Sequence, residues 1–410
     1  MYTTRRRFLH STLGTSALLS VGMHVPAFLA RTARAAGPGD GERVLVVVQL
    51  SGGNDGLNTV VPYADELYAK HRTVLRIAGD QVHKIQDGLG LHPSMDGLAR
   101  LLEENRLAIV QGVGYPNPDR SHFRSMDIWH TARPEVVDTR DGWLGRALDT
   151  VPAEKRRDVA GIHLGPSPLP LALVSQHTSV PSLESLERFR LQTAGGGLTT
   201  SALAELAQTP RPEQSELLDF IRRSTLSAYA SSEQVQEAIG SGASGADYPA
   251  FALAQRLKTI GQLIDAGLST RIYYVALDGF DTHANQLEAH AALLREFSSS
   301  VEAFVHDMAA RGHADRVLVL AFSEFGRRVA ENASAGTDHG TAAPVFLAGG
   351  AVRAGLIGAH PSLADLDQEG DVKFHTDFRQ VYAEILDRWL GCDSRSVLGR
   401  EFAHAGALAS

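Results

Sequence analysis

The sequence contains almost no cysteine. Cys392 is the only one among 410 residues, so an internal disulfide is impossible. The same scarcity excludes the cysteine clusters that hold structural zinc or iron–sulfur groups. A metal in this protein would therefore be held by histidine, aspartate and glutamate, and the stability of the fold must come from its hydrophobic core.

Other signatures are missing as well. Outside the N-terminal region, no apolar run is long enough to indicate a membrane span, and no repeat of fixed period is present. The glycine-rich turn SGGNDG at Ser51–Gly56 fits neither G-x-G-x-x-G nor G-x-x-x-x-G-K-[ST]. A redox enzyme with an organic cofactor is thus poorly supported, since no dinucleotide fingerprint follows a predicted strand.

The first 36 residues predict an export signal. Thr4–His10 contains an arginine pair followed by x-Phe-Leu, which resembles a twin-arginine signal. A short run rich in Ser, Gly and Ala follows, and Ala33–Ala36 fits a cleavage site. The alternatives are a basic amphipathic helix or a membrane anchor, but Gly22 and Pro26 interrupt the run. We expect a periplasmic or extracytoplasmic protein with no stable membrane span after signal removal.

The charge balance is acidic. The whole chain has 39 basic and 47 acidic residues, a formal charge of −8. Removing residues 1–36, which hold five arginines and no acid, leaves 34 basic and 47 acidic residues and a charge of −13. Such a surface disfavours nucleic acid as a partner. An anionic substrate remains compatible with it where a metal supplies local positive charge.

Hydrophobic patterns predict an α/β fold with a mostly parallel sheet covered on both faces. Continuous apolar runs predict buried strands, and apolar residues at helical spacing predict helices. The predicted strands are 43–51, 107–113, 159–164, 171–174, 271–277, 316–322 and 345–348. The predicted helices are 94–105, 121–129, 214–239, 248–266, 286–311 and 376–390.

The domain organisation follows from the same patterns. Residues 43–391 are predicted to form one large domain, and residues 392–410 a C-terminal tail. Stretches rich in Gly, Pro and Ser surround long predicted helices, so residues 190–268 are predicted to be a helical insertion.

Acidic residues and histidines follow the strongest predicted strands. In an open parallel sheet, ligands bind beyond the carboxyl ends of the strands, so these residues are candidates for one site. Asp55 follows the first strand. A bare carboxylate in this place would repel a phosphate, so Asp55 is better interpreted as a metal ligand. The alternative is that Asp55 only shapes the turn.

Two later junctions offer further metal ligands. Asp278, Asp281 and His283 follow the strand RIYYVAL, in a loop that could bind a cation. Asp338 and His339 are adjacent and flanked by glycines, which would let the backbone turn sharply and bring both to one centre. The alternative for each pair is a polar surface loop.

A hydroxyl nucleophile is predicted near residue 121. Pro116 and Pro118 precede Ser121, which fits the N-cap of a helix, where the positive field favours an alkoxide and a bound anion. Ser125 is its rival one turn later, and Arg124 could clamp an oxyanion bidentately. Plain capping by Ser121 and a structural arginine form the alternative.

Three more residues have two interpretations each. Arg327 and Arg328 could bind an anion or, more simply, pair with Glu324 or Glu331 to hold a loop. His375 could be a late metal ligand or a surface residue ahead of a helix.

Several motifs together resemble a known family. SGGNDGLNTVVPY, GYPNPDRSHFRSMDIWHTA, DGFDTHANQ, SEFGRRVAEN and GTDHGTAAPVFLAGG are similar to the exported bacterial proteins grouped as domain of unknown function 1501. The resemblance covers essentially residues 43–391. It implies the alkaline phosphatase and sulfatase superfamily, a three-layer αβα sandwich and a two-metal centre for phosphate or sulfate esters.

The resemblance also implies roles in chain order. Asp55, Asp278 or Asp281, His283, Asp338, His339 and His375 correspond to metal ligands, and Ser121 or Ser125 to the nucleophile. The resulting hypothesis is a hydrolase of small-molecule or glycan esters that uses divalent ions. Zinc is the first candidate metal, with manganese, magnesium and calcium as alternatives. The second hypothesis is a catalytically silent binding or assembly protein at the cell surface. The sequence does not indicate an oligomeric state.

Overall fold

The computed structural model describes residues 42–136, 139–152, 159–183 and 246–409. The predicted signal at 1–36 and the predicted helix 214–239 lie outside these residues.

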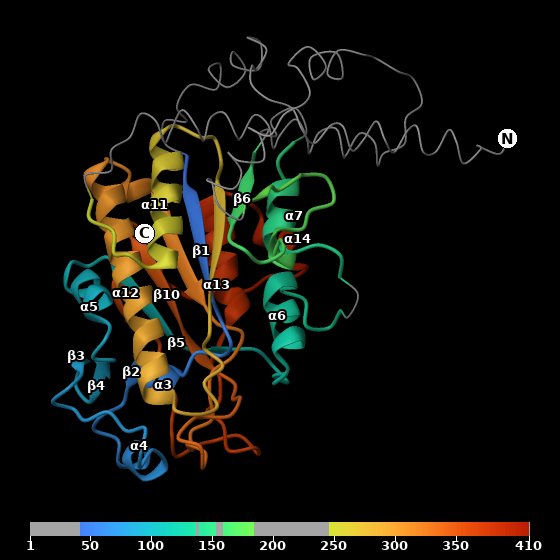
Figure 1. Cartoon of the computed structure of the whole chain (residues 1–410). Coiled ribbons are helices and arrows are strands. Elements are labelled where there is room, and N and C mark those ends of the chain that lie inside the picture. Colours follow the sequence, from blue (N-terminus) through green and yellow to red (C-terminus); the bar gives the residue numbers. More distant parts are fainter. Residues whose placement is uncertain (1–41, 137–138, 153–158, 184–245, 410) are drawn as a thin grey trace, which may run out of the picture.

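One large sheet forms the centre of the molecule (Figure 1). It has nine strands in the order β11-β5-β10-β9-β1-β8-β6-β7, and β12 also pairs with β5. Every pairing is parallel except those of β10 with β5 and β9, so the predicted mostly parallel sheet is confirmed. The strands are β1 Val44–Ser51, β5 Leu107–Gly114, β6 Gly161–Leu164, β7 Ser182–Leu183, β8 Ile272–Asp278, β9 Val317–Phe322, β10 Ala343–Gly349, β11 Gly355–Ile357 and β12 Thr376–Asp377.

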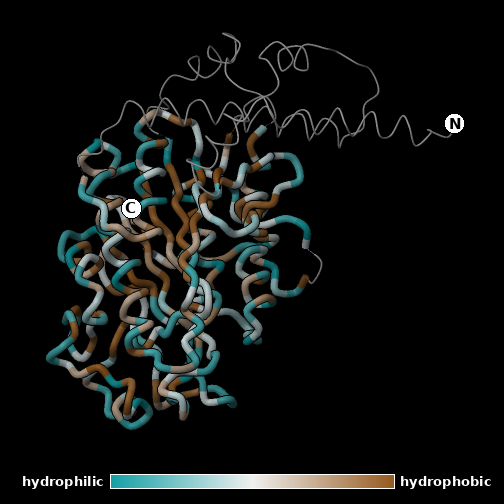
Figure 2. The backbone as a smooth tube through the Cα atoms, in the orientation of Figure 1, coloured by the Kyte–Doolittle hydropathy of each residue, from teal (hydrophilic) through white to brown (hydrophobic). Residues whose placement is uncertain are grey.

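Helices cover both faces of this sheet, which makes three layers (Figure 1). Successive side chains of a strand point to opposite faces: Val44, Val46 and Val48 of β1 pack in one core, whereas Leu45 and Val47 pack in the other. This double burial explains why the strands are continuous apolar runs, seen as the brown centre of Figure 2. The first core includes α5 Asp96–Glu103, α11 Ala252–Asp265 and α12 Gln286–Ala310, and the second α6 His122–Thr131, α7 Trp143–Asp149, α13 Phe378–Glu384 and α14 Ser394–Leu398.

A small second sheet lies beside the loops at one end of the large one (Figure 1). Its three strands run in the order β2-β4-β3, and it carries its own small apolar cluster around Tyr68 and Leu57. The elements of this region are α3 Gly56–Thr59, β2 Val60–Val61, α4 Glu66–His71, β3 His83–Gln86 and β4 Leu89–Leu91.

Two predicted elements are wrong in type or length. The segment 171–174 is not a strand but a 3₁₀ turn, η3 Leu171–Leu173, whose apolar residues pack against α6 and α7. Pro170 precedes it, and proline lacks the N–H that a strand ladder needs. The predicted helix 376–390 instead starts at Phe378 after the short strand β12 and ends in a π-helical turn, η5 Ile385–Leu390.

The regions assigned to an insertion and a tail also contact the core. Helix α11, placed within the predicted insertion, packs on α12 in the layer that covers the sheet. Beyond residue 391, α14 packs against α7 and α13, and Leu408 is buried. No helix among the described residues has the length and apolarity required to cross a bilayer.

The carboxyl ends of β1, β8 and β9 lie at the same edge of the sheet. Ser51, the last residue of β1, pairs with Asp278, the last residue of β8, and Gln49 pairs with Phe322 at the end of β9. The loops that follow these three strands therefore begin side by side.

Candidate metal centre

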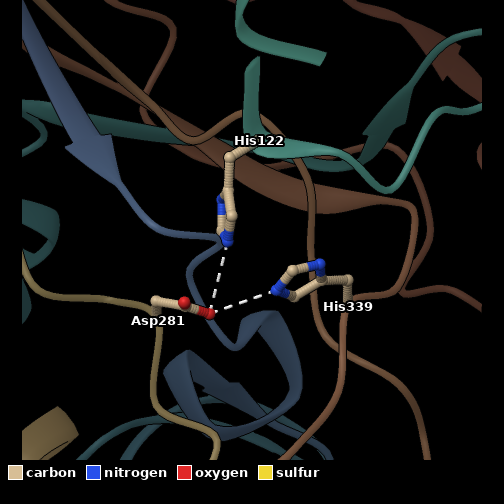
Figure 3. Close-up of side chains that lie close together, drawn as sticks. All are labelled: His122, Asp281 and His339. Carbon is tan, nitrogen blue, oxygen red and sulfur yellow. Dashed lines mark hydrogen bonds and ion pairs between the residues drawn. The ribbon is translucent and has the colours of Figure 1, made fainter. Parts of the chain in front are cut away.

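His122, Asp281 and His339 converge at this edge (Figure 3). His122 is the first residue of α6, Asp281 lies in the loop after β8, and His339 lies in the loop between β9 and β10. Their nearest nitrogen and oxygen atoms all lie within 4.8 Å of one another. Asp281 Oδ1 is 3.3 Å from His122 Nε2 and 3.1 Å from His339 Nε2.

His283 joins the cluster from the loop that carries Asp281. Its Nε2 lies 3.0 Å from Asp281 Oδ1 and 2.9 Å from His339 Nε2. Three imidazole Nε2 atoms, from three separate chain segments, thus surround one carboxylate oxygen.

The second ring nitrogen of each histidine faces a hydrogen-bond acceptor. His122 Nδ1 is 2.8 Å from Glu324 Oε1, and His283 Nδ1 is 3.1 Å from Asp338 Oδ1. His339 Nδ1 is 2.7 Å from the carbonyl oxygen of Arg120. Since carboxylates and carbonyls only accept, each Nδ1 carries a proton and donates it.

This arrangement leaves lone pairs pointing at one another. A neutral imidazole protonated at Nδ1 has an unprotonated Nε2, so in the neutral rings three such atoms would face each other and the Asp281 carboxylate. His122 Nε2 is buried and makes no hydrogen bond, although it lies 3.3 Å from Asp281 Oδ1. Outward nitrogens held by acceptors and inward nitrogens without protons are what histidine ligands of a metal show. The residues present fit a cation.

Arg327 anchors the loop of Asp281. Its buried guanidinium donates to Asp281 Oδ1 at 2.7 Å and to the carbonyl of Thr337 at 2.8 Å, and it also bonds the carbonyl of Gly52. Partial burial acts to raise the pKa of Asp281, but the bond from Arg327 and the neighbouring His339 outweigh it and lower this pKa to about 2. Asp281 is therefore an anion at neutral pH, and Arg327 holds the loop, as expected, with Asp281 as its partner in place of Glu324 or Glu331.

The histidines have opposite pKa shifts. The bond to the Glu324 carboxylate raises the pKa of His122. Burial lowers the pKa of His339, and the nearby Arg120 carbonyl and Asp281 carboxylate only partly offset this effect. The bonds from Asn332 and His283 lower the pKa of Asp338.

The glycines around Asp338 and His339 serve close packing. A Cβ on Gly336 would lie 2.2 Å from the carbonyl carbon of His283, and one on Gly340 would lie 2.5 Å from that of Arg327. Neither glycine has a positive φ. Because Gly336 and Gly340 have no side chains, the loop that contains them packs closely against the neighbouring backbone. The sequence predicts a sharp backbone turn as the reason for these glycines, and the structure shows close packing as the reason.

Asp55, a predicted ligand, lies outside the cluster. Its side chain is fully buried and forms a 2.5 Å ion pair with Arg72. It also caps α3 and accepts a bond from Gln286 Nε2 at 2.5 Å. Burial acts to raise its pKa, but Arg72 outweighs this and lowers the pKa to about 2. These contacts use both carboxylate oxygens, so Asp55 holds the turn, as in the second sequence interpretation.

Two other predicted ligands also lie elsewhere. Asp278 is the exposed last residue of β8 and is not part of the group around Asp281. His375 Nε2 bonds the carbonyl of Ala359 at 2.8 Å, and its ring packs against Gly112.

The two candidate serines differ in their surroundings. Ser125 is buried, and its Oγ lies 2.6 Å from the Glu324 carbonyl oxygen and 2.8 Å from the Tyr115 hydroxyl. Ser121 is the N-cap of α6 as predicted, but it is exposed and its side chain makes no capping bond. Arg124 bonds the carbonyl of Pro134 at 2.7 Å.

The sequence interpretation missed two residues of the cluster. The local sequence does not indicate His122, because its role depends on Glu324, which is far away along the chain. Glu324 was considered only as a partner of Arg327 or Arg328, yet it is buried and bonds His122 Nδ1 and the Gly52 N–H, both at 2.8 Å. The position of each residue along the chain could have indicated its role, because Glu324 follows β9 and His122 follows the N-cap of α6.

The chain belongs to the family described as protein of unknown function DUF1501, whose model matches residues 42–403. No curated protein matches the sequence.

Several solved structures are similar to this chain at low identity. The PsFucS1 sulfatase from Pseudoalteromonas sp. is 12% identical over 94% of this chain and 76% of that one, with a TM-score of 0.40. A protein in the alkaline phosphatase superfamily from Vibrio parahaemolyticus is 8% identical over 88% and 69%, with a TM-score of 0.36. The C-terminal periplasmic domain of EcEptC from Escherichia coli is 10% identical over 88% and 87%, with a TM-score of 0.35.

Proposed function

We propose that this protein is an exported metal-dependent hydrolase of phosphate or sulfate esters. The observation that carries the proposal is the convergence of three Nε2 atoms, from His122, His283 and His339, on the carboxylate of Asp281. In the neutral rings these atoms carry lone pairs that repel one another, and a bound cation would remove that repulsion.

The ligand set suits one zinc ion better than two ions. Imidazole and carboxylate are ligands that zinc prefers, whereas calcium and magnesium prefer oxygen alone. One group of three potential ligands gathers among the described residues, so we propose one ion where the resemblance implies two. A zinc ion here would polarise an ester oxygen and lower the pKa of a water molecule.

The protein residues have distinct parts in such a reaction. Glu324, Asp338 and the Arg120 carbonyl fix the tautomer and orientation of the three histidines. Ser121 is proposed as the attacking hydroxyl, since it is exposed beside His122, whereas the oxygen of Ser125 is buried and bonded. Export by the twin-arginine pathway is proposed on the sequence of residues 4–36.

Metal analysis of the purified protein combined with assays of aryl phosphates and aryl sulfates tests this proposal. We expect about one equivalent of zinc, retained through dialysis, and hydrolysis of one ester class. His122→Ala and His339→Ala should lose both the metal and the activity. His375→Gln is the matched control, because the structure places this histidine elsewhere.

The result decides between function classes. Stoichiometric zinc without turnover of any ester would contradict the hydrolase and favour the silent binding protein. Zinc content that is unchanged in His122→Ala and His339→Ala would contradict the metal centre itself. Ser121→Ala that keeps full activity would leave the metal centre standing and remove the serine from the mechanism.

A further inference from the structure

An open cavity of about 460 Å³ lies beside the metal centre. His122 and Asp281 line it on one side. Helix α6, the end of β1, the turn η3 and Glu324 after β9 supply most of the remaining lining, which includes Phe123, Met126 and Leu171. A molecule that reaches the metal ligands from this side would therefore contact these three apolar side chains.

Phe123 is the most exposed large hydrophobic side chain among the described residues, at 88%. A single exposed apolar residue is ordinary on a protein surface. Phe123, however, directly follows a metal ligand and shares the cavity with Met126 and Leu171. An aromatic ring in this place offers a face against which another ring can stack.

A hydroxyl group faces the same cavity at the end of β1. Ser51 Oγ accepts a hydrogen bond from Gln49 Nε2 at 2.7 Å. The side-chain oxygen Oε1 of Gln49 is in turn 2.9 Å from His130 Nε2 and 2.5 Å from the Tyr274 hydroxyl. These bonds fix the amide of Gln49, so Ser51 acts as acceptor toward it and keeps its own hydrogen for another acceptor.

The charges around the cavity are of one sign. Asp127, Asp281 and Glu324 line it, and no arginine or lysine is among the described lining residues. Asp281 is paired with Arg327, and Glu324 with His122, whereas the exposed Asp127 lies on α6 one turn beyond Phe123. A second negative charge on a bound ester would be repelled by Asp127.

We propose that this cavity binds the alcohol half of the ester, and that this half is an uncharged ring. The ring, aryl or sugar, stacks on Phe123, and an oxygen that it carries accepts the hydrogen of Ser51. This assignment rests on the proposed hydrolase function, which it makes more specific by naming the kind of alcohol released.

Phenyl and methyl esters of the same acid test the stacking. In the zinc-loaded enzyme, Phe123→Ala should raise the ratio of the phenyl KM to the methyl KM by about two- to tenfold, as expected for a lost aromatic contact. Val74→Ala, at another exposed apolar side chain, should leave this ratio unchanged. An unchanged ratio in Phe123→Ala would overturn the assignment of the ring to this wall.

A charged substrate tests the electrostatic part. We expect the KM for the 4-carboxyphenyl ester to exceed that for the phenyl ester, and Asp127→Asn to reduce this difference by about twofold, since a charge at an exposed site has a modest effect. A carboxyphenyl ester that is preferred by the native enzyme would overturn the assignment.

Binding of phenol separates this proposal from the hydrolase itself. Ligand-detected NMR needs no turnover, so it works even when no ester is hydrolysed. Phenol signals that weaken on binding to the native protein and recover in Phe123→Ala would support the subsite in either case. No binding of phenol to the native protein would overturn the subsite, whereas absence of turnover alone would contradict only the function.

Discussion

Asp55 and Asp281 follow neighbouring parallel strands, yet they lie in opposite environments. Asp55 is completely buried and paired with Arg72, whereas the side chain of Asp281 is 48% exposed and faces three histidines. Both carboxyls have a pKa lowered to about 2. A low pKa therefore does not distinguish a structural carboxylate from a metal ligand, and the identity and accessibility of the partners do.

The largest effect is expected at the buried pair. Arg72→Met should lower the free energy of unfolding by about 3–5 kcal/mol, because it leaves the Asp55 carboxylate buried without its cation. Urea unfolding of the metal-free protein measures this loss. Arg100→Met breaks the more exposed pair with Glu302 and should cost about 1 kcal/mol or less. Equal losses in the two variants would contradict the structural role of Asp55.

Asp281, the proposed metal ligand, should show the opposite pattern. Asp281→Asn should weaken zinc binding by more than about 100-fold. This loss is larger than the loss expected for a residue that only holds a metal ligand in place. It should destabilise the metal-free protein less than Arg72→Met does, since Asp281 is half exposed. Competition with a zinc chelator measures the affinity. Asp278→Asn is the control three residues away, and a comparable weakening there would contradict the assignment of ligands.

A smaller loss of zinc affinity is expected from the carboxylates behind the histidines. Glu324→Gln should weaken zinc binding by about 10- to 100-fold, because the neutral amide no longer fixes His122 as strongly. Asp338→Asn should have less effect, since the side chain of Asp338 is 54% exposed and that of Glu324 only 2%. Chelator competition on both variants gives the order, and the reverse order would contradict this dependence on burial.

The interior also makes stability depend on pH away from the metal ligands. Burial lowers the pKa of His92 and His130 to about 3 and that of His163 and His290 to about 4, from 6.5. Between about pH 4 and pH 6.5, these histidines therefore bind fewer protons in the folded state than in the unfolded state. The contribution of these histidines to the free energy of unfolding should be fully present above pH 6.5 and should fall as the pH drops toward 4.

Urea unfolding of the metal-free protein at pH 7.0, 6.0 and 5.0 measures this slope. His130→Gln should reduce the slope, because one of the buried imidazoles is gone, while exposed His306 provides the control in His306→Gln. A free energy of unfolding that is constant over this range would contradict the burial of these neutral rings.

The fold was largely predictable, because its strands are buried on both faces and leave continuous apolar runs such as Val44–Ser51. The exception at 171–174 shows the limit of that signal. An apolar segment buried between helices has the same composition as a short strand, and only Pro170 indicates the difference.

The site was predictable in its place more than in its members. Asp281, His283 and His339 lie together as predicted, since the ends of parallel strands meet at one edge, and their role as metal ligands stays a proposal. Asp55 follows the same rule but is neutralised by Arg72, 17 residues away, through a contact that no local pattern encodes. His122 was missed because its role depends on Glu324, 202 residues away.

The smallest effect is expected at His375, which sequence position alone would place among the ligands. Its imidazole bonds the Ala359 carbonyl and the Thr376 hydroxyl. These bonds join the two ends of the connection between β11 and β12. His375→Gln should keep zinc affinity unchanged and lower the free energy of unfolding by about 1 kcal/mol, the usual contribution of a hydrogen bond. Zinc titration and urea unfolding of this one variant measure both quantities. A loss of zinc affinity similar to that of Asp281→Asn would mean that the cluster in Figure 3 is incomplete and that a second set of ligands extends toward β12.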